Sequence, residues 1–142
     1  MFNPFSAPSP ARANPFAHAY RQIDAETGVA SASPHRLVAM LFDNLVDSIA
    51  QARGAMQAGR IEDKAHAVGR AVRIVEEGLR ASLDPRAGEL AERLNELYGY
   101  VAQRLTLANL RNDLAMLDEC QGLVAPLRDA WVQIGANVPQ HP

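Results

Sequence analysis

Apolar residues recur at helical spacing from residue 33 onward, and the first such stretch predicts a helix over about 34–58. Ser33 is suited to cap this helix, Pro34 to its first position and Gly59 to the residue after its end. Its apolar positions form two rows: Leu37, Leu41, Leu45, Ile49, Ala52 and Met56, and beside them Val38, Phe42 and Val46. Two rows are wider than one packing stripe requires, so one face of this helix is predicted to have a second contact.

A second helix is predicted over about 61–83, because its apolar positions alternate in steps of four and three along one seam. The seam consists of Ile61, Ala65, Val68, Val72, Val75, Leu79 and Leu83. Asp84 and Pro85 then repeat the cap-plus-proline signal and predict a third helix that continues to about Ala108.

A fourth helix is predicted to be capped by Asn112 or Asp113 and to end before Gly135. Pro126 falls inside it and is predicted to kink it, because proline removes one backbone hydrogen bond. Trp131 is predicted to be the largest single contributor to the core.

These four amphipathic helices, joined by short loops and without strand-like alternation, predict an all-α fold: an antiparallel four-helix bundle over residues 33–135. Residues 1–13 are rich in proline, serine and alanine, and they are predicted to be a disordered tail. A short N-terminal capping helix is predicted over 14–25, and residues 136–142 are predicted to be a disordered C-terminus.

The triplet Asn-Pro-Phe occurs twice in the N-terminal region, at 3–5 and 14–16. Such a triplet serves as a docking motif in some adaptor systems, but it is also a plain turn or helix-start signal, and the second interpretation is favoured here. The short helix after it carries Phe16, Tyr20 and Ile23, three apolar residues in a segment without a core of its own.

Composition and charge narrow the class of protein. The chain of 142 residues has 48% hydrophobic and 21% charged residues, with no apolar stretch long enough to span a bilayer and no secretory leader, which predicts a soluble cytosolic protein without membrane insertion. A single cysteine, Cys120, fits a reducing compartment. The net charge is −2 and the basic residues, of which only Lys64 is a lysine, are interspersed with acids, which argues against a nucleic-acid partner.

Candidate catalytic and metal-binding patterns are weak. Asp63 and His66 form one acid-x-x-His spacing, but a di-iron site in a helical bundle needs a second copy on a facing helix. Glu92 and Glu96 stand one turn apart without a histidine or hydrophobic partner, and a solvated face explains them better. The sequence therefore predicts no enzyme, no metal and no cofactor, and Cys120 is predicted to be a small core residue.

The stretch "ELYGYVAQRLTLANLRND", residues 96–113, places two tyrosines among leucines on several faces of the third helix. Tyr98, Leu107 and Leu110 lie off its main seam, and large exposed apolar patches usually bind something. Two interpretations stay open: the N-terminal and fourth helices cover these residues as ordinary core, or a partner does.

Five separated blocks carry a resemblance to the flagellin-specific export chaperone family, FliS, over roughly residues 15–134. The blocks are "AYRQ" (19–22), "SPHRLVAMLFDN" (33–44), "KAHAVGRAVRIVEEGL" (64–79), "ELYGYVAQRLTLANLRND" (96–113) and "LRDAW" (127–131). Each block alone is a weak signal, but their order and spacing together are specific.

The resemblance implies an antiparallel helical bundle without enzymatic activity that binds the disordered C-terminal segment of flagellin in hydrophobic grooves in the bacterial cytosol. It implies that binding prevents premature polymerisation and assists delivery to the flagellar type III export apparatus, with an export-gate component as a further candidate partner. The free protein is expected to be a monomer or weak dimer. The alternative is a regulatory or oligomerising bundle whose partner is not flagellin.

The positions that match the family's blocks, together with Ile23 and Leu110, are the predicted partner-binding residues. They are Tyr20, Ile23, Leu37, Met40, Leu41, Leu45, Tyr98, Leu105, Asn109, Leu110 and Asn112. The chain departs from the family at Phe42, where tyrosine is common, and at Asn44, where glycine is common. The resemblance also implies that the N-terminal segment with its tyrosine acts as a cap, and we expect Phe16, Tyr20 and Ile23 to cover the groove when no flagellin is bound.

Overall fold

The computed structural model of the protein describes residues 33–136. Local capping chemistry starts the first helix of this described part. The Ser33 hydroxyl accepts a hydrogen bond from the Arg36 amide at 3.1 Å, and α2 runs over Pro34–Gln57. Gly59 follows with a φ of 73°, a backbone conformation that glycine adopts without strain. The predicted first helix is thereby confirmed, whereas the tail, the short capping helix and the C-terminal residues 137–142 lie outside the described residues.

The remaining helices are α3 (Ile61–Arg73), which continues as a wider π-helical segment η1 (Ile74–Arg80), α4 (Glu89–Arg111) and α5 (Leu114–Ala136). The elements of the described part of the chain are all helical, and the predicted all-α bundle is confirmed. No helix between residues 33 and 136 is both long and apolar enough to cross a membrane. Pro126 lies inside α5 as predicted.

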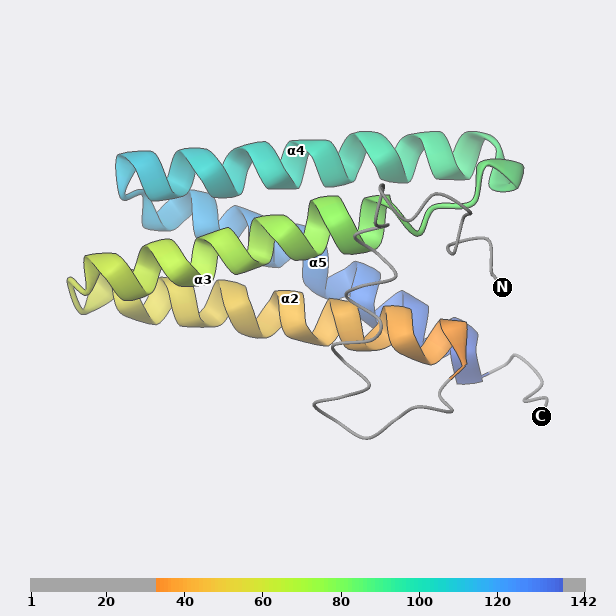
Figure 1. Ribbon diagram of the computed structural model, residues 1–142, viewed down its shortest axis with the longest axis horizontal. Helices are drawn as coiled ribbons and strands as arrows, with labels where there is room; N and C mark the ends of the chain where they lie inside the picture. The colour runs from red at the N-terminus through yellow and green to blue at the C-terminus, as the bar shows by residue number, and fades with distance from the viewer. Residues whose placement is uncertain (1–32, 137–142) are drawn as a thin grey trace, which may run out of the picture.

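Each helix packs antiparallel to the next one along the chain, and α5 closes the bundle against α2 (Figure 1). Short connections leave neighbouring helices little choice of direction. The tightest connection lies between α4 and α5, where Asn112 ends α4 with a φ of 53° and the Asp113 carboxylate accepts a hydrogen bond from the Met116 amide at 3.2 Å. Both candidate caps of the fourth helix are therefore used, one for each helix end.

The start of the third helix differs from the prediction. Asp84 accepts a hydrogen bond from the Arg86 amide at 2.9 Å, but it caps only a single 3-10 turn, η2 (Pro85–Ala87). Gly88 then takes a φ of 62°, which breaks the helical path, and α4 begins at Glu89. The prediction that the third helix begins at Asp84 and Pro85 is wrong. A capping residue followed by proline specifies one helical turn, but not the conformation of the residues after that turn.

The buried face of α3 and η1 also differs from the predicted seam. Ile61 is 70% exposed and Ala65 is exposed, whereas Lys64 is 6% exposed. The buried residues are Lys64, Ala67, Val68, Ala71, Val75, Gly78 and Leu79. Small residues on this face allow a close approach to α2: a Cβ on Gly78 would stand 3.2 Å from both methyl carbons of Leu41. Val68, Val75 and Leu79 of the predicted seam are buried as predicted, whereas at the start of α3 Lys64 takes the inward position in place of Ile61 and Ala65.

The core consists mainly of aliphatic side chains from all four helices. Fully buried members include Leu45, Ile49, Val75, Leu79, Val101, Leu105, Leu117 and Cys120. The prediction that Cys120 is a core residue is confirmed, and its thiol lies 3.9 Å from the Val101 carbonyl oxygen. Burying a leucine or valine side chain contributes roughly 1.5–3 kcal/mol, so these residues supply most of the stability of the bundle.

Trp131 is partly buried and packs against the edge of the core, and its rank as the largest single contributor stays a prediction. Its ring stacks on His35, with centroids 4.3 Å apart and planes 6° from parallel. The Trp131 indole donates to the His35 carbonyl at 2.9 Å, and His35 Nε2 donates to the Trp131 carbonyl at 2.8 Å. This reciprocal pair joins the first turn of α2 to the last third of α5.

Alkaline pH is expected to destabilise the bundle through Cys120 and Tyr98. Burial raises the pKa of the Cys120 thiol from 9.0 to about 12 and the pKa of the Tyr98 phenol from 10.0 to about 12. As the pH rises, the unfolded chain loses these protons before the folded chain does. The contribution of the two protonated groups to the free energy of unfolding is therefore fully present below pH 9. It falls as the pH rises towards 12, by up to about 1.4 kcal/mol per pH unit for each group.

Urea unfolding at steps between pH 7 and 11 measures this loss, with Cys120→Ala as the matched variant. Cys120→Ala is expected to be less stable at pH 7, because it leaves a small cavity, but to lose stability more slowly between pH 9 and 10. Equal slopes for the two proteins over that interval would contradict the assignment to Cys120.

Candidate partner-binding surface

Five of the predicted partner-binding residues lie inside the bundle. Leu37, Leu41, Leu45, Tyr98 and Leu105 are between 0% and 8% exposed and belong to one hydrophobic cluster. Side chains this deeply buried support the surface above them, and a partner reaches them only if the helices separate. Their direct contact with a partner stays a prediction.

The other predicted residues are accessible to different degrees. Met40 is partly buried against the core on α2, and Leu110 is 78% exposed near the end of α4. Asn109 and Asn112 lie beside Leu110 in the last turn of α4 and at its cap. Tyr20 and Ile23 fall outside the described residues. The structure thus brings together the three predicted residues at the end of α4.

Lys64 explains what the two asparagines do within the fold. Its ammonium donates to the Asn109 carbonyl at 3.1 Å and to the Asn112 side-chain oxygen at 2.9 Å. The last carbonyls of a helix lack partners within the helix and carry partial negative charge, so a buried cation is well placed there. The chain's single lysine therefore holds the α4–α5 turn against α3.

α3 begins and α4 ends at the same end of the bundle (Figure 1). A hollow of about 270 Å³ opens there. It is lined by Ala55, Met56, Gly59, Arg60, Ile61, Lys64 and Asn112. Ile61 on one helix and Leu110 on the other are the two most exposed large apolar residues of the described chain. We call this hollow, together with the exposed residues Ile61, Leu110 and Asn112 at the same end of the bundle, the α3/α4 end surface.

Sequence reasoning missed Ile61 as a surface residue because its spacing fits the apolar seam of the second helix. The available signal was its position in the first turn after Gly59 and Arg60, where one face of a helix is not yet covered by its neighbours. Exposed apolar residues also occur at the opposite end of the bundle, where Leu90 is 61%, Val132 48% and Ile134 52% exposed.

Polar contacts fix α4 against α5 beside these surfaces. Glu119 accepts hydrogen bonds from the Tyr100 hydroxyl and, at 2.8 Å, from Arg104 Nε. The Tyr100 hydrogen bond and then the Arg104 hydrogen bond lower the pKa of Glu119, while the bond to Glu119 raises the pKa of Tyr100. All three groups are at the surface, so this cluster positions helices more than it stabilises them.

The described residues contain no group of three or more histidine, cysteine, aspartate or glutamate side chains that could hold a metal ion. Asp63, one half of the acid-x-x-His spacing, forms an ion pair with Arg60 at 3.3 Å instead. The arrangement as a whole offers an apolar hollow and exposed apolar side chains on a rigid bundle, which suits binding of a protein segment.

The comparisons with known proteins agree with this architecture. The family model described as Flagellar protein FliS matches residues 16–138. The flagellar secretion chaperone FliS of Salmonella typhimurium is 43% identical over 117 residues, 82% of this chain and 87% of that protein. The flagellar secretion chaperone FliSB of Pseudomonas aeruginosa is 42% identical over 113 residues, covering 79% and 89%. The flagellar secretion chaperone FliS of Bacillus subtilis is 35% identical over 120 residues, covering 84% and 85%.

Replacing Lys64 by methionine tests its role at the end of α4. Methionine keeps much of the apolar stem but removes the ammonium, which leaves the Asn109 carbonyl and the Asn112 side chain without their donor. The expected loss of unfolding free energy is about 1–3 kcal/mol by chemical denaturation. Arg93→Met, which breaks the exposed pair with Glu89, is the control and is expected to cost at most about 1 kcal/mol. Lys64→Met with wild-type stability would refute the role.

Proposed function

The chain belongs to the FliS family of flagellar proteins, and on this basis we propose that it binds the disordered C-terminal segment of flagellin in the bacterial cytosol. Binding prevents premature polymerisation of flagellin and assists its delivery to the flagellar type III export apparatus. The observation that carries the proposal is the match to the FliS family over all four helices. Exposed apolar residues on the bundle support it.

The broader role follows directly from the relatives. Proteins 35–43% identical over about four fifths of the chain are named flagellar secretion chaperones, so the chain has the role of a flagellar export chaperone. The names are those of chaperones and not of enzymes, which confirms the prediction of a non-enzymatic protein.

The α3/α4 end surface supports the proposed binding of a flagellin segment. Ile61 and Leu110 are 70% and 78% exposed, and an apolar helix can bury them together with the hollow beside Met56. A disordered segment that folds on binding gives up about 2–5 kcal/mol to ordering. Each apolar side chain that becomes buried contributes roughly 1.5–3 kcal/mol to binding, so several must be buried to offset this ordering cost and leave useful affinity.

The predicted residues divide between two roles in this proposal. Leu110 and the partly buried Met40 contact the flagellin segment, whereas buried residues such as Leu41 and Leu105 keep α2 and α4 in place beneath it. Asn109 and Asn112 orient the end of α4 through Lys64. A rigid support of this kind lowers the cost of ordering on the chaperone's side.

Calorimetric titration of the intact protein with the C-terminal peptide of flagellin is expected to show a 1:1 complex. The double variant Ile61→Gln with Leu110→Gln is expected to weaken binding at least about tenfold, because each lost apolar contact removes about 1 kcal/mol or more. Leu90→Gln, at the opposite end of the bundle and 61% exposed, is the matched control and is expected to bind within about twofold of wild type.

Absence of binding at tens of micromolar, in both calorimetry and a pull-down with the wild-type protein, would exclude the flagellin proposal and favour a partner other than flagellin. Sedimentation with and without flagellin separates that case from self-association. If the double variant and Leu90→Gln bound equally well, flagellin binding would stand but its assignment to the α3/α4 end surface would be wrong.

Tyr20 and Ile23 are proposed to cover apolar surface when flagellin is absent. In the full chain, Tyr20→Ala with Ile23→Ala is expected to increase the fluorescence of the apolar dye ANS, while the urea midpoint stays unchanged, because a cover is not part of the core. Phe2→Ala is the control. A large drop in the midpoint would instead make these residues a fifth structural element.

A further inference from the structure

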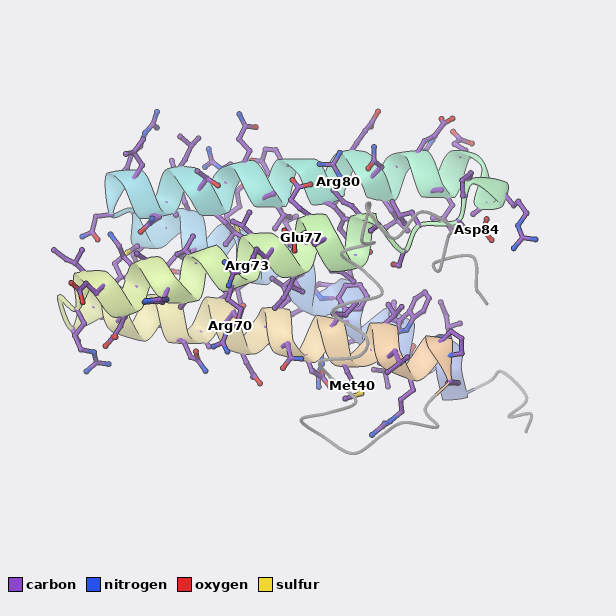
Figure 2. The ribbon with its side chains drawn as sticks, in the orientation of Figure 1. Met40, Arg70, Arg73, Glu77, Arg80 and Asp84 are labelled. Atoms are coloured by element: carbon purple, nitrogen blue, oxygen red, sulfur yellow. The ribbon has the colours of Figure 1, made fainter. Side chains whose placement is uncertain are left out.

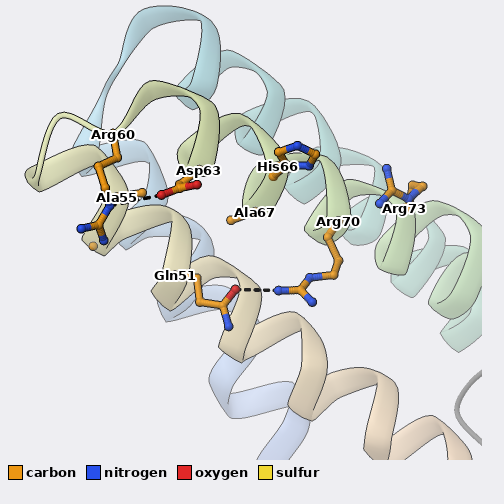
Figure 3. Close-up of a pocket in the computed structure, with 9 residues that line it drawn as sticks. Gln51, Ala55, Arg60, Asp63, His66, Ala67, Arg70 and Arg73 are labelled. Carbon is orange, nitrogen blue, oxygen red and sulfur yellow. Dashed lines mark hydrogen bonds and ion pairs between the residues drawn. The ribbon is translucent and has the colours of Figure 1, made fainter. Parts of the chain in front are cut away.

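A second hollow, of about 590 Å³, lies on the flank of the bundle between α2 and α3 (Figure 3). Arg60, Arg70 and Arg73 line it, and Asp63 is the one carboxylate among its lining residues. From this arrangement we propose that the hollow is a docking site for an acidic segment of a protein partner. The proposal goes beyond the flagellin proposal and does not depend on it, because it rests on charge and not on the apolar end surface.

The charge of the hollow is opposite to that of the chain. The whole protein has a net charge of −2, whereas three guanidinium groups here face one carboxylate. Beyond Arg70 and Arg73 the same helix carries Glu77 and then Arg80 (Figure 2), and Arg80 is already paired with Glu76 at 3.0 Å. Local positive potential on an otherwise acidic protein favours an acidic partner at this position.

The guanidinium groups are only weakly engaged within the protein. Arg60 Nε lies 3.3 Å from Asp63 Oδ2, but both side chains are about two-thirds exposed, so this pair is easily exchanged. Arg70 Nη2 donates to the Gln51 side-chain oxygen at 2.6 Å, a neutral acceptor. Arg73 has no ion pair with any residue between 33 and 136. Carboxylates offer guanidinium groups stronger, bidentate bonds than these contacts do.

Small residues form the uncharged part of the hollow and leave room for a chain. Gly54, Ala55 and Ala67 line it, and no atom lies within 4 Å of where a Cβ on Gly54 would stand. At Gly69 the space is taken by Arg73, whose Nη1 lies 3.7 Å from the position of a Cβ, so the missing side chain there accommodates the guanidinium. The absence of bulk along this line admits the backbone of a docked segment.

The spacing of the arginines favours a peptide over a compact anion. Arg60 and Arg73 are thirteen positions apart, which is about 20 Å along a helix. A phosphate ion reaches one or two of these groups, whereas an acidic segment presents several carboxylates over the same length. Figure 3 shows the three side chains distributed along α3 and not gathered on one point.

Titration of the ¹⁵N-labelled full chain with a hexaglutamate peptide tests the proposal, with hexaglutamine and inorganic phosphate at equal ionic strength for comparison. Saturable shifts are expected at the amides of residues 60–73, with binding that weakens as salt is added. Arg70→Gln with Arg73→Gln is expected to weaken hexaglutamate binding about fivefold or more. The matched control, Arg86→Gln with Arg93→Gln, removes the same charge from exposed arginines elsewhere and is expected to change it less than about twofold.

Three outcomes would overturn the proposal. Equal weakening by both double variants would indicate attraction by overall charge only. Phosphate binding with the same affinity and the same shifts would indicate a site for small anions. Tighter hexaglutamate binding by the full-chain variant Asp24→Asn with Glu26→Gln would assign the hollow to the acidic part of the protein's own N-terminal segment. The flagellin titration is unaffected by these outcomes, so failure of one proposal is distinguishable from failure of the other.

Discussion

Burial of aliphatic side chains between antiparallel helices is the interaction on which the rest of this structure depends. Leu45, Ile49, Leu105 and Leu117 come from α2, α4 and α5, and each is essentially inaccessible to solvent. Because short connections impose the direction of each helix, the helices have few ways of burying these residues together. That packing decides which remaining apolar residues stay outside, and those are the ones available to a partner.

Polar groups act mainly at the ends of the helices, where the packed core leaves backbone groups unsatisfied. Lys64 meets the last carbonyls of α4, and the reciprocal bonds of His35 and Trp131 tie the start of α2 to α5. Arg53 and Arg128 form further ion pairs between α2 and α5 at 2.6 Å each. Burial of the core drives the association of the helices, and these polar contacts set their register. A fixed register gives the surface of the bundle a defined shape.

Two surfaces of different chemistry result from this rigid support. The α3/α4 end surface combines an apolar hollow, lined by Ile61, with the exposed Leu110 near the end of α4, while the flank between α2 and α3 presents arginines over small residues. An export chaperone has to hold a client and also meet other components of its pathway. Apolar burial supplies affinity for a folding segment, and charge supplies steering and selectivity, so the two surfaces suit two different kinds of contact.

Periodicity and caps such as Ser33 and Asp113 act within one or two turns, so the helices, the fold class and the family could be predicted from the amino-acid sequence, apart from the start of α4. Cys120 could be predicted as a core residue in the same way. The packing of the helices against one another settles which face of α3 turns inward, why Ile61 is exposed while Lys64 is buried, and why Leu41 and Tyr98 support the surface from within. The burial of a side chain depends on its neighbours from other helices, and the apolar pattern along a single helix carries no information about those neighbours.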